Sequence, residues 1–251
     1  MKTIFVTTLN KKLYDKYAHR LFSTYEKTNQ KLPMYVFVED NITQYPAIKG
    51  ITILDLFQHE PESKKFADRH QNQIKEYMAK NPNSKEFRYD AKRFSYKVFA
   101  QNAGRQYGDK MFFVDADIIF NKPIPQVFFE QALPDDCFIS FFDRPNSYTE
   151  TGFVGFDNTK QCADTFFKEY LNYYINDTIF ELPGYLDCDV FDATREKCKF
   201  QHGYKEKKLG DGGKAHIMAR DKWFGEYFDH RKGNRKEQEH SPEWRKHNES
   251  R

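Results

Sequence analysis

The chain has 251 residues, its 40 basic residues nearly balance its 37 acidic ones, and 17% of its residues are aromatic. This length exceeds that of a minimal disulfide-stapled scaffold, and the aromatic rings supply material for a substantial core. A formal net charge of +3 is too small for the whole surface to act as a polyanion binder, so an anionic ligand needs a local site.

The first part of the chain alternates predicted strands with predicted helices. Apolar and β-branched runs predict strands at residues 3–9, 34–38 and 51–54, and helical composition and spacing predict helices at residues 11–27 and 60–83. Such an alternation is typical of an α/β fold whose central sheet is mainly parallel and flanked by helices.

A further helix and a very apolar strand follow. The helix predicted at residues 89–107 has its apolar residues on one face, and Arg93 and Lys97 stand four residues apart on a neighbouring face. Residues 111–114 predict a fully buried strand that ends directly before Asp115. Because ligand-binding residues of such sheets gather at the carboxyl ends of the strands, we expect a site at this edge.

The second half is patterned less regularly. Its predicted strands and helix are residues 137–142, 151–156 and 160–174. Residues 199–214 combine four glycines with five lysines, which predicts a mobile basic loop. No linker divides the chain, so we predict a single domain over residues 1–236 followed by a polar, frayed C-terminal tail over residues 237–251.

The strongest local signal for chemistry is Asp115-Ala116-Asp117. Two carboxylates separated by one small residue can both turn toward one divalent cation if the backbone leaves the extended form after the strand. Oxygen ligands of this kind suit Mn²⁺ or Mg²⁺, and these ions are commonly shared with substrate phosphates.

A second signal lies near the end of the predicted domain, in residues 230–236. This segment holds one candidate metal ligand, His230, a glycine that allows close backbone approach, Gly233, and four cations that include Lys236. Such a cluster is what a diphosphate site requires.

Together the two segments resemble the metal-dependent glycosyltransferases of the GT-A type, and more narrowly the lipopolysaccharide galactosyltransferase and glycogenin group. His230, Gly233 and Lys236 match the late H-x-x-G-x-x-K of that group, whereas Glu237 and Gln238 stand where the group has Pro-Trp. The resemblance implies a GT-A-like nucleotide-sugar-binding fold.

The resemblance also implies how the site is built. It implies that the metal ion, Mn²⁺ or Mg²⁺, is coordinated by Asp115, Asp117 and His230. The residues that it places at the donor and its diphosphate are Arg93, Lys97, Asp115, Gly233 and Lys236. The subgroup alone implies a UDP-linked donor and retention of the anomeric configuration.

Two more segments bear on the sugar. Asp187-Cys188-Asp189 is similar to the group's D-Q-D segment near the reacting carbon, with cysteine in place of glutamine. Glycosyl transfer needs a carboxylate beside an oxocarbenium-like centre, so Asp187 and Asp189 are the catalytic candidates. Acids that stabilise the start of a helix are the alternative.

The segment Glu150-Thr151-Gly152 falls where related enzymes have a polar residue and a glycine below the donor sugar. We expect these three residues to contact sugar hydroxyls; a simple turn into a strand is the alternative.

The sequence therefore predicts an enzyme that transfers a sugar from a nucleotide-sugar donor to a hydroxyl of a glycan or another acceptor, such as lipopolysaccharide or modified nucleic acid. One alternative is a nucleotidyltransferase or phosphoesterase in which Asp115, Asp117 and Asp189 hold two metals. Another is a nucleic-acid-binding protein that uses the basic loop. Without a signal peptide, an 18-residue apolar run or a C-x-x-C pair, we expect a cytoplasmic location.

Overall fold

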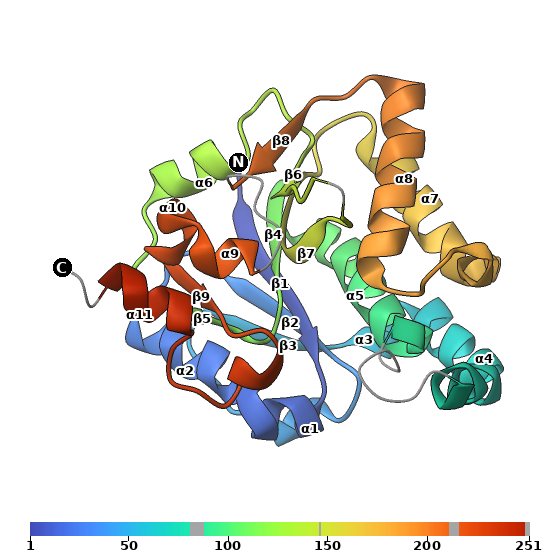
Figure 1. Cartoon of the computed structure of the whole chain (residues 1–251), viewed down its shortest axis with the longest axis horizontal. Coiled ribbons are helices and arrows are strands. Elements are labelled where there is room, and N and C mark those ends of the chain that lie inside the picture. Colours follow the sequence, from blue (N-terminus) through green and yellow to red (C-terminus); the bar gives the residue numbers. More distant parts are fainter. Residues whose placement is uncertain (81–87, 146, 211–215, 249–251) are drawn as a thin grey trace.

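A computed structural model of the chain describes residues 1–80, 88–145, 147–210 and 216–248. It is a mixed α/β structure around a seven-stranded sheet of order β3-β2-β1-β4-β7-β6-β8, which confirms the predicted fold class (Figure 1). The strands of this sheet are β1 (Thr3–Leu9), β2 (Met34–Val38), β3 (Ile51–Asp55), β4 (Lys110–Val114), β6 (Ile139–Phe142), β7 (Glu150–Asp157) and β8 (Glu206–Leu209). A small second sheet pairs β5 (Ile118–Phe120) with β9 (Phe228–His230).

The direction of the strands determines where a site can form. β1 is paired in parallel with β2 on one side and with β4 on the other, so the chain order reverses beside β1. β7 runs antiparallel to both β4 and β6, so β6 has the direction of β4. The carboxyl ends of β1, β4 and β6 and the amino end of β7 therefore meet at one edge, at a topological switch point where α/β sheets bind ligands.

Helices cover both faces of the sheet (Figure 1). One apolar core cluster lies under α3 (Leu56–His59), α4 (Pro61–Lys80), α5 (Ala91–Gly104), α7 (Ala163–Ile175) and α8 (Asp187–His202). A second cluster lies on the other face, under α2 (His19–Lys27), α6 (Gln126–Ala132), α9 (Ile217–Arg220) and α10 (Lys222–Gly225). Aromatic rings make up much of both clusters, as composition predicts: Phe112 stacks on Phe153 with centroids 5.3 Å apart across β4 and β7.

The helix predicted at residues 11–27 is divided into three parts. α1 (Lys11–Leu13) is capped by the side chain of Asn10, and a π-helical turn (Tyr14–Ala18) joins it to α2. π-turns inside helices are rare and often occur at functional sites. This one places the buried Tyr17 beside the sheet edge described above.

The prediction of a mobile loop over residues 199–214 is wrong for the residues that the structure describes. α8 continues to His202, and β8 then joins the edge of the central sheet by pairing in parallel with β6. The side chain of Glu206 is buried and forms ion pairs with Arg195 at 3.1 Å and with Lys199 at 2.7 Å. These two cations therefore stabilise β8 at the edge of the sheet. Residues 211–215 lie outside the described residues.

The expected fraying after residue 236 is also wrong for residues 237–248, because α11 (Pro242–Asn248) forms there and the segment before it is held; residues 249–251 lie outside the described part of the chain. The guanidinium of Arg20 donates to the backbone carbonyls of Lys236, Glu237 and Gln238 at 2.8–3.3 Å. The buried carboxylate of Asp229 accepts from the amide of Ser241 at 2.7 Å. Among the described helices none is both long and apolar enough to cross a membrane.

Candidate metal centre and cleft

The site starts from the backbone that follows β4. The amide of Ile118 donates to the carbonyl of Asp115 at 3.0 Å, which closes a turn over residues 115–118. The chain thus leaves the extended form after β4, which is the condition under which both carboxylates can turn toward one cation. The amide of Asp115 also donates to the carbonyl of Gly152 at 2.8 Å, so the turn lies against the start of β7.

The third ligand comes from the small sheet. β5 pairs with β9 in the register Ile118 to His230, which brings His230 beside the turn from more than a hundred residues away along the chain. Ligand atoms of Asp115, Asp117 and His230 all lie within 4.8 Å of one another. The structure therefore assembles the three residues that the family resemblance implied as metal ligands.

The polar atoms of this cluster fit a cation. Asp117 Oδ1 and His230 Nε2 are buried and face each other at 3.2 Å, and among the described residues neither atom has another hydrogen-bond partner. Burial would raise the pKa of Asp117, but His230 and Lys236 outweigh it and hold that pKa well below its ordinary value. Two carboxylates and one imidazole whose ligand atoms converge are a donor set for Mn²⁺ or Mg²⁺.

Gly152 leaves the room that this cluster needs. A Cβ at this position would lie 3.0 Å from Asp115 Oδ2 and 3.2 Å from the Cε1 atom of His230. Any larger residue would therefore push on two of the three candidate metal ligands at once. Contact of Gly152 with a sugar stays a prediction, and the structure adds that the absence of a side chain here leaves room beside Asp115 and His230.

Two lysines neutralise the carboxylates. Lys236 Nζ lies 2.9 Å from Asp117 Oδ2, and its ammonium also lies over the ring of Tyr17. Lys97 Nζ lies 2.7 Å from Asp115 Oδ1 and 2.6 Å from Asp187 Oδ2. Burial would lower the pKa of Lys97, but these two carboxylates outweigh it and raise that pKa, so the ammonium stays charged. Lys97 thus joins the metal cluster to the first catalytic candidate.

The two predicted catalytic acids have different surroundings. Asp187 is buried, lines the cleft and accepts from the hydroxyl of Thr151 at 2.6 Å in addition to Lys97. Asp189 accepts from the amide of Leu186 at 3.2 Å at the start of α8, and it does not line the cleft. The structure therefore brings Asp187 to the site and places Asp189 at a helix start.

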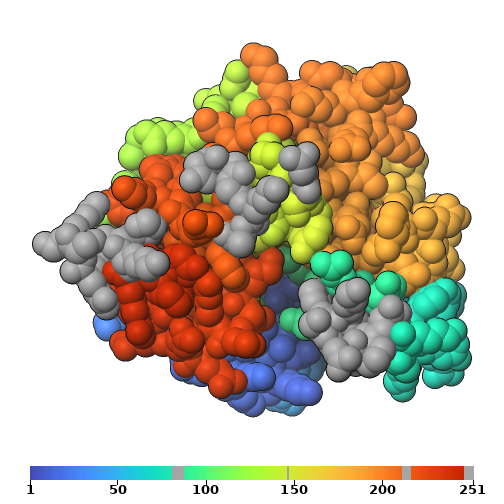
Figure 2. Space-filling view, in the orientation of Figure 1, coloured from blue at the N-terminus to red at the C-terminus, as the bar shows by residue number. Residues whose placement is uncertain are grey.

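The cleft around the cluster has two lobes that share Arg93, Lys97, Asp115, Asp117 and Lys236. The smaller lobe, about 90 Å³, extends to the ends of β1 and β2 and is lined by Thr8, Tyr17 and Glu39 among others. The larger lobe, about 300 Å³, extends to β7 and α8 and includes Glu150, Thr151, Asp187 and Gly233. In Figure 2 this face of the molecule is hollowed between the C-terminal part (red) and the start of α5 (green).

Glu150, which was predicted to contact sugar hydroxyls, is already paired with two cations in this structure. Its carboxylate accepts from Lys232 Nζ at 2.9 and 3.0 Å and lies 3.4 Å from the guanidinium of Arg144. Burial would raise its pKa, but Lys232, His230 and Arg144 outweigh burial and lower the pKa of Glu150 to about 2. Glu150 therefore fixes two cations in the larger lobe.

Sequence reasoning missed Arg144, and it gave no role to Tyr148, Thr149 and Lys232, although all four line the larger lobe. A signal for Arg144 existed. It follows the strand predicted at residues 137–142, and once that strand is known to be parallel to β4, its carboxyl end falls at the edge of the site. No local sequence pattern indicates a role in the cleft for the other three residues.

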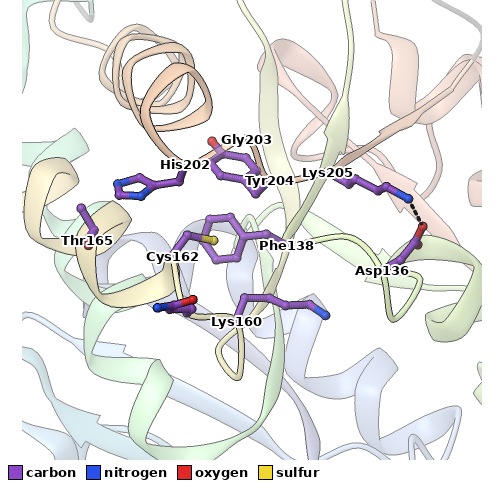
Figure 3. A pocket seen from close by; sticks show the side chains of 10 residues that line it. Asp136, Phe138, Lys160, Cys162, Thr165, His202, Gly203, Tyr204 and Lys205 are labelled. Carbon is purple, nitrogen blue, oxygen red and sulfur yellow. Dashed lines mark hydrogen bonds and ion pairs between the residues drawn. The ribbon is translucent and has the colours of Figure 1, made fainter.

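A separate cavity of about 530 Å³ lies between α7, the end of α8 and β6 (Figure 3). His202, Lys160 and Cys162 are among its lining residues, and Lys205 forms an ion pair with Asp136 at 3.1 Å at its edge. None of the residues predicted as functional lines this cavity, so the chemistry is concentrated in the two-lobed cleft.

Comparison with known proteins agrees with the architecture. No family model and no curated protein sequence matches the chain. Among solved structures, the glycosyltransferase GlyE of Streptococcus pneumoniae TIGR4 is 14% identical with a TM-score of 0.50; the match covers 84% of this chain and 46% of GlyE. Mouse xyloside xylosyltransferase 1 in its apo form is 12% identical with a TM-score of 0.46, over 84% of this chain and 86% of that one. The chain thus shares its fold with GlyE and spans about half of its length.

Proposed function

We propose that the chain is a metal-dependent glycosyltransferase that moves a sugar from a nucleoside diphosphate sugar to an acceptor hydroxyl. The observation that carries this proposal is that Asp115 and Asp117, which form a cluster with the buried His230, line both lobes of the cleft. A nucleotide sugar has its diphosphate in the middle, so a metal at this junction would lie under the diphosphate, with nucleoside and sugar on opposite sides.

The charge of the cleft supports a diphosphate ligand. The larger lobe is lined by five basic residues, Arg93, Lys97, Arg144, Lys232 and Lys236, and by four acidic ones, Asp115, Asp117, Glu150 and Asp187. A bound divalent ion would give the lobe a clear positive excess, which a diphosphate would neutralise. The smaller lobe is too small to enclose a nucleoside, which would therefore remain partly exposed.

Each residue then has a role that follows from its contacts. When bound, the metal would stabilise the negative charge of the leaving diphosphate. Lys236 is placed to bind the same phosphates, since it already lies at Asp117. Asp187 is held by Lys97 and Thr151, both at 2.6 Å, and would provide a fixed negative charge beside the sugar carbon that becomes positive during transfer.

We further propose that the chain resembles the lipopolysaccharide galactosyltransferase and glycogenin group in using a UDP-linked donor and in retaining the anomeric configuration. His230 in the metal cluster and Gly233 and Lys236 in the larger lobe support this subgroup, because all three matched positions belong to one site. Gly233 has a φ of +69°, a conformation that favours glycine.

The two alternatives have less support. A two-metal phosphoesterase or nucleotidyltransferase needs Asp189 beside Asp115 and Asp117, and Asp189 lies outside the cleft. A nucleic-acid-binding surface needs unpaired lysines in the segment predicted as a basic loop. Three of its described lysines pair with acids: Lys199 with Glu206, Lys205 with Asp136 and Lys208 with Asp143.

The test is to incubate the protein with Mn²⁺ and a panel of nucleoside diphosphate sugars without an acceptor and to measure free nucleoside diphosphate. We expect slow release from one or a few donors, lost when EDTA is added. Asp187→Asn should reduce the release strongly, and the matched variant Asp189→Asn should retain it if folded. Equal release with and without metal, or from no donor of the panel, contradicts the proposal.

A further inference from the structure

We propose that Tyr148 is the platform on which a sugar ring of the acceptor lies, so that the acceptor of this enzyme is a glycan. This inference rests on the proposed glycosyl transfer and goes beyond it by naming the acceptor class. It starts from a half-buried aromatic ring that lines the larger lobe and is absent from the lining of the smaller one.

The position of Tyr148 is at the rim of the lobe. Thr149, Glu150 and Thr151 are all buried, with exposed fractions of 3–4%, and Gly152 touches the metal ligands at the floor. Ser147, on the other side of Tyr148, is exposed. The chain therefore passes from buried to exposed between residues 152 and 147, and Tyr148 lies at this change while lining the larger lobe.

The ring is held in place before any ligand binds. The guanidinium of Arg144 lies over one face of the ring, 4.4 Å from its centroid. That guanidinium is itself buried and donates to the carbonyls of Tyr148 at 2.8 Å and Thr149 at 3.3 Å. On the following residue, the amide and the hydroxyl of Thr149 donate to Asp192 of α8 at 2.9 and 2.5 Å.

These contacts have an energetic consequence. A platform that is already ordered loses little conformational freedom when a ligand lies on it, so more of the contact energy remains as affinity. Tyrosine suits this task because it offers a large rigid surface with few rotatable bonds. A ring that served only to fill the core would be buried, and Tyr148 is not.

The chemistry of the ring selects the ligand class. The face of an aromatic ring carries negative charge density and has an apolar surface. A pyranose presents a patch of C–H groups on one face and hydroxyl groups around its edge, so it can lie on such a ring while its hydroxyls contact polar side chains. The lobe supplies such a polar group in the ammonium of Lys232, whose side chain is 42% exposed although Glu150 is its partner.

The location distinguishes the acceptor from the donor. The donor sugar is attached to the diphosphate and would lie at the floor, close to Gly152 and the metal cluster. Tyr148 precedes Gly152 by four residues, a span of at most about 14 Å of extended chain, and it lies on the solvent side of the floor. A second sugar ring, adjacent to the donor sugar and entering from solvent, fits this place.

The experiment compares the wild type with Tyr148→Phe, Tyr148→Leu and Tyr148→Ala. The donor is the nucleotide sugar that releases most free nucleoside diphosphate with Mn²⁺, and the acceptor probes are methyl pyranosides and free disaccharides. For each protein we would measure release without acceptor, transfer to each probe, and the KM of donor and acceptor separately. Phe200→Ala is the matched control, because Phe200 is a 94% exposed ring on α8 outside the cleft.

We expect Tyr148→Ala and Tyr148→Leu to raise the acceptor KM roughly tenfold, and by more than they change the donor KM, because stacking on an aromatic ring is lost. Tyr148→Phe and Phe200→Ala should stay within about twofold of the wild type, as expected when only the ring face at position 148 matters.

Several outcomes would overturn the inference while leaving the proposed function intact. These are an unchanged acceptor KM in Tyr148→Ala, a rise in donor KM instead, or a wild type that releases nucleoside diphosphate but neither transfers to nor binds any sugar probe in saturation-transfer NMR. Failure of acceptor-free release in the wild type contradicts the proposed function itself. Thermal unfolding of each variant shows whether it is folded.

Discussion

The two halves of the chain contribute to the cleft in different ways. Up to residue 120 the chain builds four parallel strands with their helices, and it places Arg93, Lys97, Asp115 and Asp117 at or beside strand ends. After residue 120 it adds the antiparallel strand β7, the strand β6, the edge strand β8, and β9 of the small sheet. These elements return His230, Lys232 and Lys236 to the same edge.

This difference shows that neither half is a site alone. The first half supplies two carboxylates and a lysine on a rigid parallel frame. The second half supplies the imidazole that completes the metal cluster and most of the larger lobe. We therefore expect activity and stability to depend more on contacts that join the halves than on contacts within either half.

The largest effect is expected at the metal cluster, which spans both halves. Asp115→Asn, Asp117→Asn and His230→Gln should each abolish metal-stimulated release of nucleoside diphosphate. Changes to residues that only support a metal ligand already cost about 10–100-fold, and a lost ligand costs more. Steady-state assays with and without Mn²⁺ check this. Near-wild-type activity in all three variants would show that the halves do not meet through a metal.

Lys97 joins the halves by a second route, between Asp115 and Asp187. Lys97→Met leaves two largely buried carboxylates without their shared counter-ion and should lower the free energy of unfolding by roughly 3–5 kcal/mol. Mn²⁺ should restore part of this loss, because it neutralises Asp115. Urea unfolding of Lys97→Met is compared with Lys64→Met, which breaks an exposed pair with Asp68 and should cost at most about 1 kcal/mol. Similar losses of unfolding free energy in both variants would show that Lys97 does not stabilise the contact between the two halves.

Glu39 belongs entirely to the first half, at the end of β2. Burial raises its pKa to about 7, so the folded protein binds a proton here more tightly than the unfolded chain does. The contribution of Glu39 to the stability of the wild type should therefore fall as pH rises from about 4.5 to about 7 and stay lower above it. Glu39→Gln should be more stable than the wild type by roughly 3 kcal/mol at pH 8, with no gain below pH 4.5.

Urea unfolding from pH 4 to pH 8 measures this difference, with the exposed Glu26→Gln as control. The side-chain amide of Asn10 donates to Glu39 at 3.0 Å, and glutamine can still accept that bond. A constant difference between Glu39→Gln and the wild type across the range would show that Glu39 titrates normally.

The smallest effect is expected at Lys236, on the last segment of the second half. Lys236→Ala should raise the Kd for UDP in the presence of Mn²⁺ roughly tenfold, because one charge-assisted hydrogen bond to a phosphate is lost. Calorimetry measures it, with the exposed Lys16→Ala as control. Deletion of residues 237–251 should also weaken the binding of UDP, because Arg20 donates hydrogen bonds to the carbonyls of Glu237 and Gln238 and so holds the chain next to Lys236. An unchanged Kd in Lys236→Ala would place the diphosphate elsewhere.

The sequence predicts the first half well because its signals are local. The strands predicted at residues 3–9 and 34–38 agree with β1 and β2, and the carboxylates at the end of β4 were found from one apolar run. The second half depends on pairing between distant segments. The lysines and glycines of residues 199–214 suggested a loop, whereas β8 forms there because β6 and the buried Glu206 offer partners that no local pattern shows.

The same reason explains what was missed at the site. Arg144 and Tyr148 are ordinary residues of a polar connection, and only the direction of β6 and the contact with α8 give them a place in the cleft. Asp187 and Asp189 are indistinguishable as a pair in the sequence. The start of α8 separates them, because a helix turns residues two positions apart to different faces.

The central claim is that residues of both halves hold one divalent ion that also binds the donor diphosphate. Pulsed electron paramagnetic resonance of Mn²⁺ bound to the protein with UDP tests it most directly. We predict that one spectrum shows coupling to an imidazole nitrogen and to phosphorus, that the nitrogen coupling is lost in His230→Gln, and that an excess of Mg²⁺ displaces the signal. A spectrum with phosphorus coupling alone in the wild type would mean that His230 is not a ligand, and one with neither coupling would contradict the metal site.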